Sequence, residues 1–190
     1  MSVAPTARLF VALWPDERGR DALAASASEW HFSSGAARVR PERLHLTLHF
    51  LGAVDRGRLP ELRRALAQVN SPRFTLMLSR PALWPGGIAV LEPVQVPPAL
   101  AQLHTALARA LLRLGLPVET RPFRPHVTLA RRAGGAAPLQ PGVAVDWPVD
   151  AHVLVESRPG GDYFVVGRRA WPERVGLECG QRDAGDTGVE

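Results

Sequence analysis

The chain has 190 residues, of which 46% are hydrophobic and 22% are charged. A chain of this size and balance folds as one domain or as two tightly packed lobes, which excludes disorder along its whole length. All 23 basic residues are arginine, so chemistry that needs a lysine is excluded, namely a P-loop lysine, a Schiff base or an adenylylated lysine.

The formal charge of +5 is unevenly distributed. Residues 173–190 contain five acidic residues and two arginines, which leaves +8 on residues 1–172. A basic surface attracts anionic partners, including nucleic acid. The single cysteine, Cys179, excludes an internal disulfide and a cysteine zinc cluster. No segment approaches the ~18 consecutive apolar residues of a membrane helix, so we expect a cytoplasmic protein with no membrane association. We also expect this protein to be a monomer.

The first half of the chain alternates short apolar runs with helical patterns. Helices are expected at residues 16–30 and, after a cap at Asp55, at residues 59–69, where leucines recur at helical spacing. Gly52 is expected to end the strand before it. The expected strands are residues 8–14, 38–41, 44–51, 74–78 and 88–91.

The second half repeats this order of elements. Five leucines predict an amphipathic helix over residues 100–114, and extended segments fit residues 126–130, 152–157 and 163–167. Residues 176–190 lack apolar periodicity, so we expect a mobile or weakly docked tail after a folded domain of residues 1–175. Strands and helices in this order predict an α+β fold with mainly antiparallel pairing and two related halves.

Two short segments make the relation between the halves specific. His45-Leu-Thr-Leu and His126-Val-Thr-Leu both contain His-x-Thr-Leu. Residues two apart in a strand point to the same face, so each histidine shares a face with its threonine, Thr47 or Thr128. The apolar residues between them face the core. Two polar pairs on leucine-rich strands indicate that both pairs line one cleft.

Two imidazoles in one cleft suit acid–base chemistry, because a histidine pKa near 6.5 allows one neutral and one protonated ring near neutral pH. Threonine hydroxyls donate to non-bridging phosphate oxygens, and Arg131 adds positive charge where a phosphorus transition state gathers negative charge. This chemistry needs no metal and no cofactor. The alternative is that each histidine is a satisfied polar residue at a strand end.

These residues resemble the two-histidine phosphoesterase superfamily, and within it the RNA 2′,3′-cyclic phosphodiesterases, historically called 2′-5′ RNA ligases. Residues 8–15 resemble the opening strand of that family, residues 45–52 its first motif and residues 125–131 its second. Tyr163 and Trp171-Pro172 resemble its closing strand. The resemblance implies a bilobal, pseudo-twofold fold, with two mainly antiparallel sheets, helices outside and a central cleft. It also implies metal-independent hydrolysis of RNA 2′,3′-cyclic phosphates to 2′-phosphates.

The resemblance also implies roles for individual residues. His45 and His126 become the catalytic acid and base, with His126 activating water and His45 protonating the 3′ oxygen. The substrate-binding residues are Thr47, Thr128, Arg131 and Phe50, the last of which stacks a base or ribose or else packs in the core. The role of His49 does not come from the resemblance, since the family tolerates varied residues at this position. His49 shares the alternating face of His45 and Thr47, so we expect it at the cleft rim, where it contacts RNA phosphates.

Three alternatives remain open. One is ATP-independent 2′-5′ ligation of a cyclic phosphate to a 5′-hydroxyl, and another is an RNA-binding module without catalysis. The third is a metal site formed by His45, His49 and His126, although no nearby carboxylate completes a common ligand set. Arginines adjacent to the motifs are candidate RNA contacts: Arg38, Arg40, Arg43, Arg124 and Arg132.

Overall fold

The computed structural model describes residues 5–139 and 144–172, and the expected tail of residues 176–190 lies outside them. The α-helices are α1 (Glu17–Ser28), α2 (Leu59–Ala67) and α3 (Pro98–Arg113). Short 3-10 turns form η1 (Pro41–Arg43), η2 (Arg56–Arg58) and η3 (Pro159–Gly161). The strands are β1 (Thr6–Leu13), β2 (Trp30–His31), β3 (Ala37–Arg38), β4 (Leu46–Asp55), β5 (Phe74–Trp84), β6 (Ile88–Pro93), β7 (Val127–Arg131), β8 (Ala137–Pro138), β9 (Val145–Val149), β10 (Ala151–Ser157) and β11 (Tyr163–Ala170).

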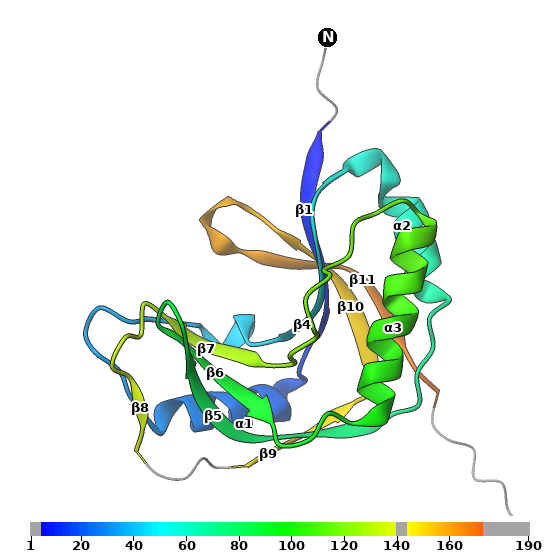
Figure 1. Ribbon diagram of the computed structural model, residues 1–190. Coiled ribbons are helices and arrows are strands. Elements are labelled where there is room, and N and C mark those ends of the chain that lie inside the picture. Colours follow the sequence, from blue (N-terminus) through cyan, green and yellow to red (C-terminus); the bar gives the residue numbers. More distant parts are fainter. Residues whose placement is uncertain (1–4, 140–143, 173–190) are drawn as a thin grey trace, which may run out of the picture.

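The main sheet is antiparallel and has the strand order β11-β10-β1-β4-β7-β6-β5-β9, with β3 beside β7. Its two halves are joined by β4 and β7, which pair at a single position, Leu46 opposite Val127. Beyond that pair the two groups of strands splay apart (Figure 1). The predicted α+β class with mainly antiparallel strands is confirmed. The two expected sheets are joined into one curled sheet, while β2 and β8 form a small separate sheet.

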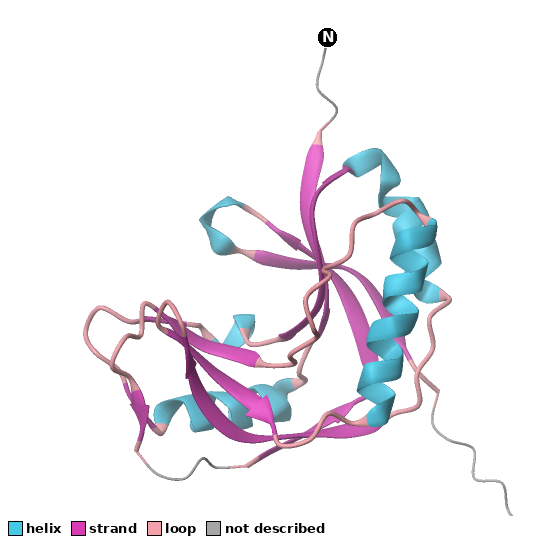
Figure 2. Ribbon diagram, in the orientation of Figure 1, coloured by secondary structure: helices cyan, strands magenta, loops and turns pink. Residues whose placement is uncertain are grey.

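The helices pack on the outside of the two lobes (Figure 2). Helix α1 packs against β9, whereas α3 packs against β4, and α2 lies against α3 and β11. The units β1–α1–β4 and β6–α3–β7 have the same order, and in both of them the two strands pair with each other. Each unit places its helix on the lobe of the other unit. The halves are therefore related by a pseudo-twofold arrangement, with β4 and β7 at its centre.

Apolar periodicity accounts for the core. Leu100, Leu103, Leu107 and Leu111 of α3 are 0–1% exposed, and Leu46 and Val127 are fully buried. These residues hold the motif strands against the helices, so the polar residues that alternate with them face away from the core. Among the described residues, none of the helices has both the length and the apolar content needed to cross a membrane.

Strand β4 differs from the expectation that it ends at Gly52. It continues to Asp55, and Gly52 adopts a φ of +69°, which a residue without a side chain tolerates. The pairing of β4 with β1 shifts register twice, so that Leu48 and Leu51 are extra residues on β4. Such bulges reverse the direction of the side chains that follow them. The simple alternation expected from the sequence therefore holds only as far as Leu48.

Other boundaries differ by smaller amounts. Strand β5 runs through Pro81 to Trp84, so the turn before β6 is shorter than expected. Strand β9 was not expected, because residues 145–149 include Pro148, which is unfavourable inside a strand. The carboxylate of Asp55 accepts from the Gly57 amide in η2, and α2 begins after that turn.

Candidate active site

The two motif strands meet at one pocket of about 420 Å³. Its lining includes six of the seven predicted site residues: His45, Thr47, Phe50, His126, Thr128 and Arg131. Phe10, Tyr163, Arg8, Arg38, Arg40 and Arg43 also line it. A slightly larger hollow, of about 490 Å³ around Trp147 and Arg73, contains none of the motif residues.

The register of β4 and β7 explains why the two motifs meet. Leu46 lies opposite Val127 in an antiparallel pair. His45 and Thr47 flank Leu46, and His126 and Thr128 flank Val127, so all four alternate with the buried pair and point to its opposite face, where they line the pocket. The side chains of Leu46 and Val127 are buried on the other face of the strands. The histidines and threonines therefore form a four-membered polar cluster at the base of the splayed strands.

Each imidazole is held by the main chain two residues before it. The Nδ1–H of His45 donates to the carbonyl oxygen of Arg43 at 2.6 Å, and the Nδ1–H of His126 donates to that of Arg124 at 2.8 Å. A carbonyl oxygen only accepts, so the proton of each neutral ring lies on Nδ1. Each Nε2 then carries the free lone pair and is available to a substrate or a water molecule.

His45 is enclosed by aromatic rings. The ring of Trp14 stacks on it, with centroids 5.3 Å apart and an interplanar angle of 11°, and Phe10 lies 5.0 Å away. Tyr163 meets its edge at 5.4 Å. These contacts fix the ring plane and exclude water from its sides, leaving the approach from the pocket.

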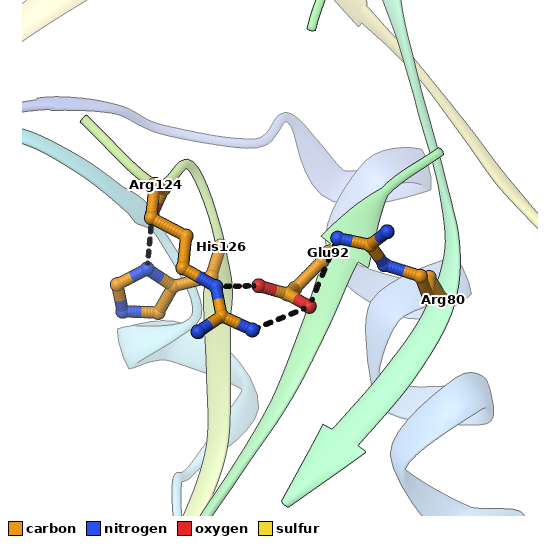
Figure 3. Close-up of polar contacts among 4 residues, drawn as sticks. All are labelled: Arg80, Glu92, Arg124 and His126. Atoms are coloured by element: carbon orange, nitrogen blue, oxygen red, sulfur yellow. Dashed lines mark hydrogen bonds and ion pairs between the residues drawn. The ribbon is translucent and has the colours of Figure 1, made fainter. Parts of the chain in front are cut away.

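His126 is held differently. Its ring lies 4.2 Å from that of Trp84, and the guanidinium of Arg124 lies over the same indole at 4.4 Å. Arg124 in turn binds Glu92, with Nε at 2.5 Å and Nη2 at 3.2 Å from the carboxylate (Figure 3). The Glu92 side chain is 2% exposed and also pairs with Arg80 at 3.3 Å.

In both lobes, the arginine whose carbonyl oxygen holds the imidazole of the motif histidine forms an ion pair, but the burial of the carboxylate differs between the two pairs. In the first lobe Arg43, which holds His45, pairs with Asp162 at 2.9 Å and lies 5.9 Å from the centroid of Tyr163. In the second lobe Arg124 pairs with Glu92 and lies over Trp84. The side chain of Asp162 is 61% exposed, in contrast to that of Glu92. The same arrangement therefore has an exposed carboxylate beside His45 and a buried carboxylate beside His126.

Burial dominates the electrostatics of both imidazoles. It lowers the pKa of His45 from 6.5 to about 4, and the charges of His126 and Arg131 act in the same direction. Burial also lowers the pKa of His126, while the carboxylate of Glu92 partly raises it. Both rings are therefore neutral near pH 7 in the free protein. This differs from the expectation of one protonated ring, and an anionic substrate must supply the field that favours a proton on one of them.

Thr47 and Thr128 are half-buried in the pocket, and within the described chain neither hydroxyl has a hydrogen-bond partner. The guanidinium of Arg131 is exposed, and its charge acts on both histidines. No acidic group among the described residues pairs with it. Two hydroxyl donors and one cation thus face the space between the imidazoles, which suits a phosphate group.

Phe50 lines the pocket because of the β4 bulge. In a regular strand Phe50 would share the core face of Leu46 and Leu48. Instead its side chain is 49% exposed, and Phe50 lies opposite Phe10 of β1. The guanidinium of Arg8 lies 4.7 Å from the centroid of its ring. A half-exposed ring at the pocket edge is a stacking surface for a base or a ribose.

The structure places His49 elsewhere, which corrects the expectation of a cleft-rim contact. The same bulge turns its side chain into the core, where it is 2% exposed and stacks on His104 at 4.1 Å. Its Nε2–H donates to the carbonyl oxygen of His104. The alternative metal site of His45, His49 and His126 is therefore not assembled. Among the described residues, no three His, Cys, Asp or Glu side chains gather in a metal-binding group.

Sequence reasoning missed Trp84 and Glu92, and it placed Arg124 only among candidate RNA contacts. The signal for Glu92 was available, because it is a charged residue at the end of the apolar run 88–91. Of the other arginines near the motifs, Arg38, Arg40 and Arg43 line the pocket, whereas Arg132 does not.

Comparison with known proteins agrees with this geometry. A family model described as the 2′-5′ RNA ligase superfamily matches residues 19–159. An RNA 2′,3′-cyclic phosphodiesterase of Thermus thermophilus is 31% identical over 180 residues, covering 84% of this chain and 87% of the relative. The Escherichia coli protein of that name is 36% identical over 58% of this chain and 64% of its own length. The Geobacillus stearothermophilus protein is 35% identical, and the match spans only 38% of its length.

Solved structures match over most of the chain. A crystal structure described as a phosphoesterase has a TM-score of 0.80 and 29% identity, covering 89% of this chain and all of that one. E. coli LigT in its apo form gives 0.78 and 29%, covering 88% and 99%. LigT in complex with 3′-AMP gives 0.78 and 30%, covering 89% and 100%. By the matched sequence, the shared fold and the paired motif strands, this chain belongs to the 2′-5′ RNA ligase superfamily.

Proposed function

We propose that this protein hydrolyses the 2′,3′-cyclic phosphate at RNA ends to a 2′-phosphate, with His45 and His126 as its acid–base pair. The single observation that carries the proposal is the convergence of both His-x-Thr pairs on one pocket, each ring held through Nδ1 so that Nε2 is free. The names of the relatives and the LigT complex with 3′-AMP support this substrate class.

The chemistry needs one proton accepted and one donated. A neutral imidazole takes a proton from water as the water oxygen attacks phosphorus, and the protonated imidazole gives its proton to the departing 3′ oxygen. The bond from phosphorus to the 3′ oxygen breaks, leaving a 2′-phosphate and a 3′-hydroxyl. Thr47, Thr128 and Arg131 stabilise the non-bridging oxygens as charge accumulates.

Binding of the cyclic phosphate changes the protonation of the two imidazoles. The cyclic phosphate carries one negative charge, which favours the imidazolium form of whichever ring acts as the acid. Arg131 lowers the pKa of both rings when the site is empty. A bound phosphate offsets that charge, so the site gains its proton as substrate binds.

The direct test is incubation with an oligoribonucleotide ending in a 2′,3′-cyclic phosphate, in EDTA, followed by identification of the phosphate position. We expect a 2′-phosphate and a bell-shaped dependence of rate on pH. His45→Ala and His126→Ala are each expected to lower kcat/KM by about 10³-fold or more. Full activity in either variant contradicts the proposal. So does a loss of activity in EDTA that is reversed when zinc is added.

The assignment of His126 as base and His45 as acid stays a prediction from the family resemblance. An aryl phosphodiester separates the roles, because a nitrophenolate leaving group needs no proton. With this substrate His45→Ala is expected to keep a much larger share of wild-type activity than His126→Ala. If His126→Ala instead keeps the larger share of activity, His126 is the acid and His45 is the base.

The alternatives are outcomes of the same experiments. Ligation requires a 5′-hydroxyl to replace water as the nucleophile, so adding an RNA with a 5′-hydroxyl end reveals a longer product if it occurs. Binding without any product over long incubation supports a non-catalytic module. The proposal further expects a monomer that acts in the cytoplasm without a membrane, which sedimentation and cell fractionation check.

A further inference from the structure

A groove leads out of the pocket along β1, β4 and β10. It has a volume of about 480 Å³ and shares Arg8 and Ser157 with the pocket. Its floor is built across the sheet, with Ala53 opposite Arg8 and Arg8 opposite Ser157. Thr6 continues the floor toward the start of β1. Thr6, Ala53 and Ser157 have small side chains, which leave this hollow open above the strands. We call it the β1 groove.

The rim of the β1 groove is basic. Arg8, Arg56 and Arg158 line it. The acidic residue in its lining, Glu156, has a side chain only 4% exposed and is ion-paired with Arg56 and Arg158. The guanidinium side chains of these two arginines are 41% and 48% exposed. The carboxylate is thus turned into the protein while the positive groups face solvent, so the groove attracts anions.

Exposed aromatic rings accompany two of these arginines. Arg8 lies over Phe50 at the junction with the pocket. Arg158 lies 3.9 Å from the centroid of Phe164, a ring that lines the neighbouring groove beside Tyr163 and not the β1 groove itself. The two rings are 49% and 42% exposed. Guanidinium groups beside exposed rings are the combination that binds single-stranded nucleic acid, through phosphates and stacked bases.

A second groove offers a comparison. It shares Arg40, Arg43 and Tyr163 with the pocket and borders the other arm of the β10–β11 hairpin. Its volume is about 290 Å³, and its lining adds Glu42, Asp162 and Phe164. Asp162 pairs with both arginines. The positive and negative charges that line this second groove are therefore balanced, so the second groove does not attract a polyanion as the β1 groove does.

We propose that the β1 groove binds the phosphodiester backbone of the RNA strand that leads to the terminal cyclic phosphate. This inference rests on the proposed function, since it assumes that the cyclic phosphate lies between His45 and His126. The groove continues four residues along β1 from Phe10 to Thr6, which is about 13 Å of strand. That length exceeds one nucleotide. The preferred substrate is therefore an oligonucleotide end and not a cyclic mononucleotide.

The test compares a cyclic mononucleotide with a hexaribonucleotide that ends in a 2′,3′-cyclic phosphate. The variant is Arg158→Gln, in which Glu156 keeps its ion pair with Arg56. Arg109→Gln, at an exposed position of α3 that does not line the groove, removes the same charge and is the matched control. Arg158→Gln is expected to lower kcat/KM about threefold to fivefold for the hexanucleotide and to leave the mononucleotide unchanged.

Binding gives a readout that does not depend on turnover. For oligoribonucleotides ending in a 2′-phosphate, wild-type affinity is expected to rise with length and to fall with salt. In Arg158→Gln the slope of log affinity against log salt is expected to be smaller by about 0.7, the value for one phosphate contact of a single strand. Arg109→Gln is expected to match the wild type in both measurements.

The outcomes separate the two proposals. If the wild type hydrolyses both substrates equally well and Arg158→Gln changes neither, the groove proposal is wrong and the proposed function stands. Equal losses in Arg158→Gln and Arg109→Gln also overturn the groove, since they indicate general electrostatics. If nothing is hydrolysed but length-dependent binding weakens only in Arg158→Gln, the proposed function fails and the groove is supported.

Discussion

Replacing Glu92 with glutamine removes the buried charge behind His126 (Figure 3). Removing one partner of a buried ion pair costs about 3–5 kcal/mol. The arginine side chains that pair with Glu92 are 58% and 59% exposed, and glutamine keeps one accepting oxygen, so both guanidiniums can be hydrated. We therefore expect a loss of about 2 kcal/mol, or about 6 °C in Tm for a chain of this length.

The same substitution reaches His126 in two ways. Loss of the Glu92 carboxylate removes a charge that raises the pKa of His126, so this pKa falls further below its ordinary value. It also releases Arg124, whose carbonyl oxygen holds the Nδ1–H of His126. Misplacing a reacting group by about 1 Å costs up to about 10²-fold in rate. Because the ring keeps its contact with Trp84, we expect about a tenfold fall in kcat with little change in KM.

Asp162→Asn is the matched control, because Asp162 holds Arg43 as Glu92 holds Arg124. Its side chain is 61% exposed, so its ion pair is worth about 0–1 kcal/mol and kcat should change by less than about threefold. Thermal unfolding, steady-state kinetics and NMR titration of the His126 ring measure these effects. A Glu92→Gln protein whose Tm, kcat and His126 pKa equal those of Asp162→Asn refutes the reasoning.

Three further predictions concern other groups. Burial lowers the pKa of His152, which is 1% exposed, to about 4, so its stability contribution is full above pH 6.5 and is lost toward pH 4. Urea unfolding should show about 3 kcal/mol less stability at pH 4 from this group, and a flat profile contradicts it. Arg131→Gln should lower kcat/KM by about 10²-fold while raising the pKa of both site histidines, measured by kinetics and NMR; unchanged kinetics would count against a phosphate contact. His49→Gln should lower stability by about 1–2 kcal/mol yet keep kcat/KM within about twofold, because its ring packs on His104 outside the pocket; loss of activity in a stable, folded protein would show otherwise.

Local patterns predicted most of the elements. The leucine spacing of α3 and the apolar runs of β1, β6 and β10 identified these segments, since each has a clear period or boundary. The pairing of His45 with Thr47 and of His126 with Thr128 also follows from the two-residue period of a strand. The bulges in β4 could not be predicted this way, because they arise where β4 pairs with β1, a strand more than thirty residues earlier. They decide that Phe50 lines the pocket and that His49 does not.

The supports of the histidines depend on the same kind of distant contact. Glu92, Trp84 and Arg124 come from β6, β5 and the segment before β7, and no local pattern links them. Their grouping follows from the order of strands in the sheet. The difference between the buried Glu92 and the exposed Asp162 likewise depends on which elements cover each position.

By itself, the sequence determined the charge, the absence of lysine and the two His-x-Thr pairs, because these depend only on residue identity and strand period. The tertiary structure alone decided that β4 and β7 touch at one pair and then diverge, which brings the two pairs to one pocket. It also decided the burial that lowers the pKa of both imidazoles. The physical reason is that burial and cross-strand register are properties of contacts between distant segments, which no local stretch of residues specifies.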